Sequence, residues 1–229
     1  MSDNKSGKIN LVDVFKRLES ETYCIIKLPN EFPGYLIGSD LDIFCYDVEK
    51  MARTILGIIG PEISDGFEIK VLNDKHQIYI DIMEGEDIHF RFDLYGELPL
   101  YRQLSIKNAF FTSVIEGSSS REFSGSVVKL PSMLDEAILR YIEYQEWYAE
   151  RPDKIKHIEY LEEKIESGEV DVIKVLDKLH YYTEIPRVKK HRKNKKMKLS
   201  VKNMKKIISY LKNNGIKKTI TRIKKVVFK

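Results

Sequence analysis

The sequence predicts an α+β protein: a small mixed sheet with helices on one face, followed by a C-terminal helical region and a basic helical tail. Three observations lead to this prediction. Helical and strand periodicities alternate over residues 10–95, apolar residues recur at helical spacing over 129–186, and lysines crowd residues 187–229. We therefore expect three regions, with bounds 1–128, 129–186 and 187–229.

The first region combines two helices with five strands. Apolar residues share one helical stripe in 10–19 and again in 48–59, where Gly60-Pro61 ends the second helix. Short runs rich in β-branched and aromatic residues predict strands. These runs lie at 23–28, 41–46, 67–72, 77–83 and 88–95.

The second region is predicted to be helical. The stretch 117–126 before it is rich in serine and glycine, and we expect a loop or linker there. Ser132 is suited to cap the first helix, since Asp135 follows three residues later. Three helices are expected, at 132–148, 154–167 and 170–182. The first carries an aromatic-rich stretch from Glu143 to Tyr148, which suits core packing or, alternatively, base stacking.

Composition indicates a reduced, cytoplasmic setting. The two cysteines, Cys24 and Cys45, have no neighbouring ligands at zinc-site spacing and predict neither a disulfide framework nor a zinc centre. The polar N-terminus, Met1 to Lys8, lacks the apolar segment of a secretory signal. No apolar run reaches the ~18 residues that a membrane-spanning helix needs.

Charge is distributed unevenly along the chain. Residues 187–229 contain 18 Lys+Arg and no Asp or Glu, whereas the other residues carry a net charge of −14. From Ser200 onward, apolar residues recur at helical spacing opposite lysines, a pattern typical of a helix lying on an anionic membrane surface. Two alternatives stay open: contact with a nucleic-acid backbone, and a helical hairpin packed on the acidic body.

Asp40 and Asp42 are the first candidate site residues. They flank Leu41 at the start of a predicted strand, so alternation places both carboxylates on one face and Leu41 on the other. Mg²⁺ prefers oxygen ligands, and it usually takes one or two carboxylates together with substrate phosphates. A third carboxylate from another strand would complete a site for two metal ions.

Asp93 is the best candidate for that third carboxylate, and Asp81 is its competitor. Both lie in alternating strands, where a charge between apolar residues calls for a functional reason. Arg91 is a candidate for offsetting the acidic cluster or for binding phosphate. His89 alternates with Arg91 and Asp93, so the three are expected to share a face, with His89 either orienting Asp93 or contacting a substrate, or else simply exposed.

The segment Gly38-Ser39-Asp40-Leu41-Asp42-Ile43 resembles the Ser-Asp-aliphatic-Asp strand signature of the DNA polymerase β-like nucleotidyltransferase superfamily. More narrowly, most of 20–185 resembles nucleotidyltransferase-like proteins of bacterial surface-polysaccharide biosynthesis. The matching features, in order, are a strand ending in a basic residue, a proline-containing loop, the acidic pair, a later strand with one Asp, a Pro-Ser helix start and a lysine-rich tail.

The resemblance implies a nucleotidyltransferase fold with 1–128 as the catalytic domain, and it implies roles for individual residues. Asp40, Asp42 and Asp93 would bind two Mg²⁺ ions, and Asp93 would also take a proton from an acceptor hydroxyl. Gly38 and Ser39 would form the loop that approaches the triphosphate. A further role, neutralising phosphate charge, would fall to Lys27.

One departure from the family pattern concerns the first strand. The superfamily carries a Gly-Gly or Gly-Ser pair about ten residues before the acidic pair, and here the chain reads Lys27-Leu28-Pro29-Asn30. A glycine pair lets backbone N–H groups approach phosphate, and Pro29 has no N–H. The donor is therefore expected to be an NTP or another phosphate donor bound in a different way.

Three functions are compatible with these observations. The first is Mg²⁺-dependent nucleotidyl or related phosphoryl transfer to a small hydroxylated acceptor, such as a sugar or a lipid-linked glycan precursor. The second is a catalytically inactive scaffold or binding protein of the same fold, attached through its tail to the inner face of the membrane. The third is a nucleotidyltransferase that modifies nucleic acid and captures it with the tail.

Overall fold

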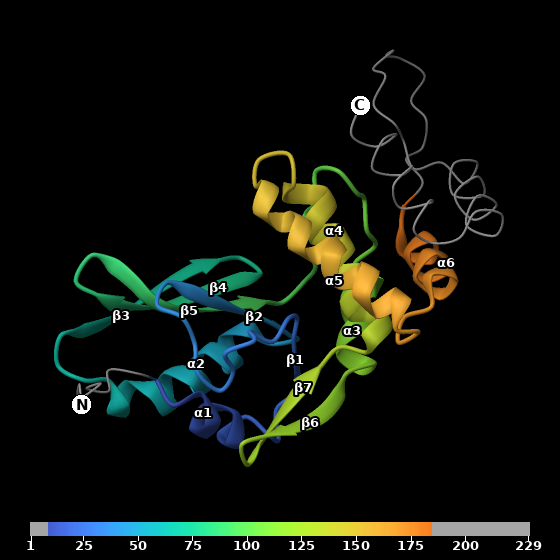
Figure 1. Ribbon diagram of the computed structural model, residues 1–229. Helices are drawn as coiled ribbons and strands as arrows, with labels where there is room; N and C mark the ends of the chain where they lie inside the picture. Colours follow the sequence, from blue (N-terminus) through green and yellow to red (C-terminus); the bar gives the residue numbers. More distant parts are fainter. Residues whose placement is uncertain (1–8, 185–229) are drawn as a thin grey trace, which may run out of the picture.

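The computed structural model of the protein describes residues 9–184. Its main feature is a five-stranded mixed sheet in the order β1-β2-β5-β4-β3, in which β2 and β5 are parallel and the other neighbours are antiparallel (Figure 1). The strands are β1 (Tyr23–Ile25), β2 (Ser39–Cys45), β3 (Phe67–Asp74), β4 (Gln77–Glu84) and β5 (Asp87–Tyr95). The expected mixed sheet and α+β class are confirmed, although the first strand is shorter than predicted.

Helices α1 (Leu11–Arg17) and α2 (Val48–Ile59) cover one face of this sheet (Figure 1). Both begin at a side-chain cap, because Asn10 accepts from the backbone N–H of Asp13 and Asp47 accepts from that of Lys50. Buried side chains of these helices, among them Phe15 and Ile55, meet the inward-facing residues of the sheet. This first core includes Leu41 and Phe92, the neighbours of the candidate carboxylates.

The helical region packs at the end of the sheet near β1 and β2 (Figure 1). It consists of α3 (Ala109–Glu116), α4 (Met133–Trp147), α5 (Ile155–Glu166) and α6 (Val172–Tyr182). The three predicted helices are confirmed, and α3 is an addition. The predicted cap is present, because Ser132 Oγ accepts from Asp135 N at 3.1 Å. These helices enclose a second core that also contains Cys24 and Phe44.

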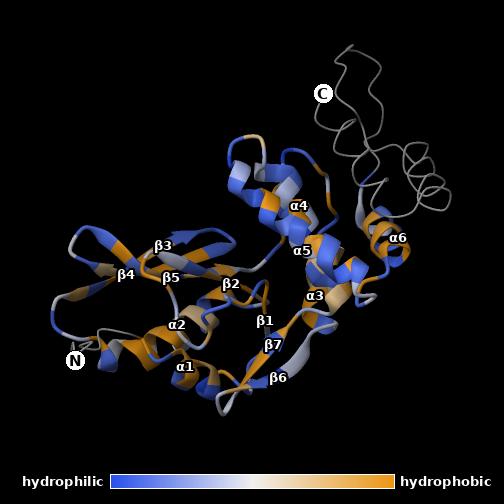
Figure 2. Ribbon diagram, viewed as in Figure 1, coloured by the Kyte–Doolittle hydropathy of each residue, from blue (hydrophilic) through white to orange (hydrophobic). Residues whose placement is uncertain are grey.

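The prediction of a loop or linker over 117–126 is wrong. The chain forms a hairpin of β6 (Ser119–Phe123) and β7 (Ser126–Leu130). Figure 2 shows the contrast within it: β7 is hydrophobic over much of its length and β6 is mostly not. Alternate residues of β7, Val128 and Leu130 among them, are buried against α1 and β1. This burial makes the serine-rich segment part of the fold.

The predicted basic tail, 187–229, lies outside the residues that the structure describes. Within 9–184, no helix is both long enough and apolar enough to cross a membrane.

Candidate active site

The parallel pairing of β2 with β5 brings the predicted carboxylates together. Asp42 lies opposite Asp93, and Asp40 lies one step away opposite Arg91. Directly paired residues of neighbouring strands project to the same face. That face is opposite to the one covered by α1 and α2, because the intervening Leu41 and Phe92 belong to the first core. The structure therefore places Asp40, Asp42 and Asp93 on one face.

Burial and mutual repulsion oppose ionisation of the central pair. Burial, together with the charge of Asp40, raises the pKa of Asp42 to about 6. The pKa of Asp93 rises to about 8, first because the side chain is buried and then because Asp42 is close, while Arg91 acts in the opposite direction. The Oδ1 atom of Asp93 is buried and has no hydrogen-bond partner within 9–184. Within 9–184, the Asp93 carboxylate therefore has only a 3.7 Å ion-pair contact, with Arg91, and no hydrogen-bonded cation at this oxygen.

A divalent cation fits Asp42 and Asp93. An ion held between them would satisfy the orphaned oxygen and remove the repulsion. Asp40 is exposed at the start of β2, at the edge of this arrangement. Across the described residues, no group of three or more His, Cys, Asp or Glu side chains is assembled for a metal. The fit is therefore to the two-carboxylate binding that Mg²⁺ commonly shows when substrate phosphates supply the remaining ligands.

Asp81 and Arg91 are engaged with each other. They are cross-strand neighbours on β4 and β5, and the Arg91 guanidinium donates to both Asp81 oxygens, with Nη2 at 2.9 Å from Oδ2. The same guanidinium lies 3.7 Å from Asp93 Oδ1 and over the ring of Tyr79. Asp81 is thus neutralised by a bidentate pair, whereas Asp93 receives only a longer contact. The geometry favours Asp93 over Asp81 as the metal ligand.

Gly38 and Ser39 are not directed toward the carboxylates. The N–H of Gly38 donates to the carbonyl of His89 at 2.9 Å, and Gly38 has a positive φ of 79°. Ser39 alternates with Asp40, so its side chain lies on the face of Leu41, where its hydroxyl is buried without a hydrogen-bond partner in the described region. The predicted contact of these two residues with a triphosphate has no geometric support.

Lys27 does lie beside the acidic pair. The preceding residue, Ile26, donates its N–H to the Asp42 carbonyl at 2.9 Å, which fixes the chain after β1 against β2. The positive charge of Lys27 opposes the rise in the pKa of Asp42, so the ammonium is within electrostatic reach of that carboxylate. Its ion-pair partner is Glu143 of α4, at 3.9 Å.

The expectation that His89 shares a face with Arg91 and Asp93 is wrong, and so is its alternative, an exposed residue. The β4–β5 register shifts between Ile82 and Met83, and this irregularity breaks the alternation next to His89. His89 is buried, and its Nε2 lies 3.2 Å from the hydroxyl of Tyr35, a residue of the first core.

Two further residues belong to this neighbourhood. Tyr95 lies close enough to Asp42 to lower the pKa of that carboxyl. Strand alternation could have identified it, since it follows Asp93 by two positions on β5. Glu143 reaches the site from α4, and no sequence signal separates it from the other acidic residues of that helix.

Comparisons with known proteins define no family for the chain. No protein-family model matches it, and no curated protein matches it. Among solved structures, it is similar to a crystal structure described as a "putative nucleotidyltransferase from H. pylori", with a TM-score of 0.32 and 12% sequence identity. That match covers 55% of this chain and 53% of the other, so the chain spans about half the length of that structure. This TM-score is too low for the similarity to indicate a function, and the site residues are the basis for one.

Proposed function

We propose that the protein catalyses divalent-metal-dependent transfer of a nucleotidyl group to a hydroxylated acceptor. The observation that carries this proposal is the parallel pairing of Asp42 with Asp93, in which a buried Asp93 oxygen has no hydrogen-bond partner in the described chain. Two carboxylates together with substrate phosphates are a common ligand set for Mg²⁺ in sites that act on phosphate. The resemblance of residues 38–43 to the nucleotidyltransferase signature agrees with this chemistry.

Each site residue then has a role. Asp42 and Asp93 would hold the metal ion, and Asp40 at the edge would complete the ligand set when a nucleotide binds. Magnesium bound there would supply Lewis-acid polarisation of the donor phosphate. Asp93 takes the proton from the acceptor hydroxyl as that oxygen bonds to the α-phosphorus, and pyrophosphate leaves with the electron pair of the broken P–O bond. Lys27 offsets charge on the donor phosphates.

For the donor we propose how its phosphates are bound, and for the acceptor we propose a chemical class. With Pro29 lacking an N–H, and with Gly38 and Ser39 directed elsewhere, the donor phosphates are bound by metal and Lys27 rather than by a backbone loop. The acceptor we propose is a small hydroxylated molecule such as a sugar or lipid-linked glycan precursor, reached at the inner membrane face through the basic tail. Support for the acceptor comes from the sequence resemblance, and support for the tail from its charge pattern.

A second candidate is a non-catalytic binding protein of the same architecture. The observations that favour it are the internal engagement of Gly38 N–H and the pairing of Arg91 with Asp81, which together leave few free groups for phosphate. Such a protein would keep the acidic pair without using it to bind a nucleotide.

Calorimetric titration of the four NTPs, with and without Mg²⁺, separates the two candidates. We expect Mg²⁺-dependent binding of at least one NTP to the wild-type protein and at least a tenfold loss in Asp42→Asn, about 1.4 kcal/mol. Asp87→Asn is the matched control, because it changes an exposed carboxylate at the other end of β5 and should leave binding unchanged. Absence of binding in a folded wild-type protein would contradict catalysis and favour the second candidate.

A further inference from the structure

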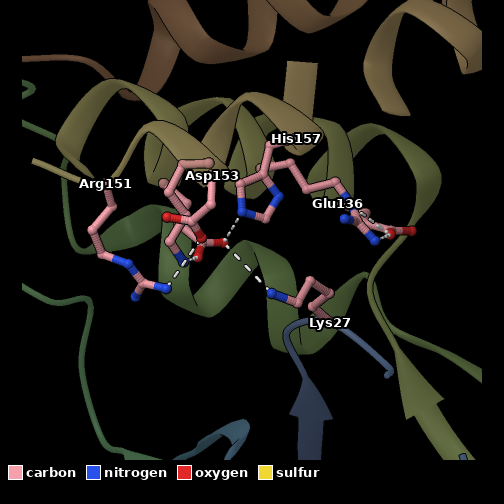
Figure 3. A network of polar contacts seen from close by, with 8 residues as sticks. Lys27, Glu136, Arg151, Asp153 and His157 are labelled. Atoms are coloured by element: carbon pink, nitrogen blue, oxygen red, sulfur yellow. Dashed lines mark hydrogen bonds and ion pairs between the residues drawn. The ribbon is translucent and has the colours of Figure 1, made fainter. Parts of the chain in front are cut away.

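Glu143 of α4 takes part in a polar network that joins the helical region to the chain after β1, in which the side chains of Lys27 and His157 point toward the same place (Figure 3). Its Oε2 is 3.1 Å from His157 Nε2 and 3.9 Å from Lys27 Nζ, and its Oε1 accepts from the ammonium of Lys154. His157 and Lys154 are both buried. Three nitrogen-bearing side chains therefore converge on one carboxylate, one from the chain after β1 and two from the start of α5.

This network keeps Glu143 ionised. Burial alone would raise the pKa of its carboxyl, but the close contact with His157 and the charges of Lys27 and Lys154 outweigh burial and hold that pKa well below the usual range. Burial lowers the pKa of His157, against the opposing effect of Glu143, which favours the neutral imidazole. Glu143 thus presents a permanent negative charge to Lys27.

Lys27 connects this network to the acidic pair. Its charge acts on both Asp42 and Glu143, and the Ile26–Asp42 backbone hydrogen bond fixes where its side chain begins. Lys154 is held close to Glu143, so the network contains two ammonium groups for one carboxylate. The excess positive charge is located at Lys27, whose contact with Glu143 is the longer of the two and whose side chain is 30% exposed. A lysine in this position can bind a phosphate while it keeps part of its interaction with Glu143.

We propose that Glu143 is a positioning residue of the nucleotide site, holding the Lys27 ammonium beside Asp42 so that it pairs with a phosphate of the metal-bound donor. This inference rests on the proposed function and deepens it, because it assigns the helical region a direct part in donor binding. Lys154 and His157 fix the Glu143 carboxylate, and Glu143 in turn limits the positions open to Lys27, so less conformational freedom is lost when phosphate binds.

The test is a double-mutant cycle with Glu143→Gln and Lys27→Gln, measured as calorimetric affinity for MgATP, MgGTP, MgCTP and MgUTP and, separately, for Mg²⁺ alone. Each single variant should weaken binding of the accepted Mg-nucleotide roughly tenfold. The Glu143→Gln effect should vanish in the Lys27→Gln background, because the two act as one unit. Affinity for Mg²⁺ alone should not fall, a result that a merely structural role for Glu143 would not give.

Glu136→Gln is the matched control. It makes the same change on the same helix and breaks an ion pair with Arg140 of 2.7 Å, but in the described region no contact links it to Lys27 (Figure 3). It should leave nucleotide affinity unchanged. If Glu143→Gln does not fold, Glu143→Asp replaces it: this variant keeps the charge near Lys154 and His157 and shortens the reach toward Lys27, so nucleotide affinity should again fall.

The outcomes separate this inference from the proposed function. Suppose that the wild-type protein binds a Mg-nucleotide. If the folded Glu143 variant then binds it equally well, or if Glu143→Gln lowers the affinity as much in the Lys27→Gln background as in the wild type, the positioning role is overturned and the proposed function stands. If the wild-type protein binds none of the four Mg-nucleotides, both are overturned. Loss of affinity in Glu143→Gln that depends on Lys27 supports both.

Discussion

At the scale of single residues, Asp93 differs from the other buried carboxylates. Glu146 is equally buried, but it accepts the backbone N–H groups of Arg102 and Gln103 at 2.9–3.0 Å. Asp135 lies 2.6 Å from the ammonium of Lys178. Asp93 has only a 3.7 Å contact with Arg91, while Asp42 repels it. Because an unsatisfied buried carboxyl destabilises the folded state, its presence requires a functional reason, and a bound cation supplies one.

Replacing Asp93 should stabilise the metal-free protein. A carboxyl whose pKa is about 8 when folded, against an ordinary 3.8, binds more protons in the folded than in the unfolded state across this range. The wild-type free energy of unfolding should therefore fall as pH rises from about 4 to about 8, and Asp93→Asn should show a shallower fall, because only the contribution of Asp42 remains. Denaturant unfolding should show the variant more stable by at least about 1 kcal/mol at pH 8 and equally stable at pH 4.

Magnesium provides the matching control for this prediction. The ion should raise the melting temperature of the wild-type protein, because it binds the folded state only, and it should raise that of Asp93→Asn much less. Asp87→Asn, an exposed change on the same strand, should behave like the wild type. Destabilisation of Asp93→Asn at pH 8 without metal would show that Asp93 has a structural partner and would argue against the metal site.

The sequence was sufficient to predict that the three aspartates share one face of the sheet, but not which other side chains surround them. Alternation is local, so Asp40 and Asp42 had to share a face, and a parallel neighbour brought Asp93 alongside. The face of His89 was predicted wrongly because a register shift is set by pairing between strands. Glu143 could not be assigned from the sequence, because its role depends on the contact between α4 and Lys27, which are distant in sequence.

At the scale of elements, helices were predicted better than the hairpin because their signals lie within the segment. The caps at Asp47 and Ser132 mark where α2 and α4 begin. In 117–126, serines and glycines favoured a loop, although buried positions alternate along β7. That burial depends on α1 and β1, which are distant in sequence. Propensity for a strand is weak compared with such packing.

The turn of this hairpin gives a prediction of its own. Ser124 and Gly125 have positive φ values of 49° and 79°, which side-chain-bearing residues rarely adopt. A Cβ on Gly125 would meet no atom within 4 Å, so Gly125→Val should be destabilising through backbone conformation alone, by about 1–2 kcal/mol in urea unfolding.

Gly57→Ala is the control, and it should change the free energy of unfolding in the opposite direction. Gly57 lies in the interior of α2 without a positive φ, and a methyl group added there would meet no atom within 4 Å. Alanine at this position should stabilise the protein by about 0.5–1 kcal/mol because it favours the helix. Equal effects of the two substitutions would mean that the 119–130 hairpin does not form in solution.

At the scale of the whole molecule, two cores share the short strand pair β1–β2. Ile25 and Ile43 face the first core, while Cys24 and Phe44, on the other face of the same strands, belong to the second. Phe44 alternates with Asp42, so the helical region covers one end of the face that carries the acidic pair. Lys27 and Glu143 join the two parts at this border. The site is therefore assembled only when both cores are formed.

This arrangement predicts that the region 1–128 does not fold alone. Ending the chain there divides β7 after Val128 and removes α4, α5 and α6, so that α3 alone remains over the second-core residues Cys24 and Phe44. The apolar surface that α4, α5 and α6 no longer cover costs about 25 cal/mol per Å² of lost burial, which a small sheet domain cannot offset. A 1–128 fragment should bind ANS and lack a cooperative thermal transition, whereas 1–184, which contains both cores, should unfold cooperatively. A cooperative transition in the shorter fragment would show that the first core folds without the second. The site would then not depend on the helical region.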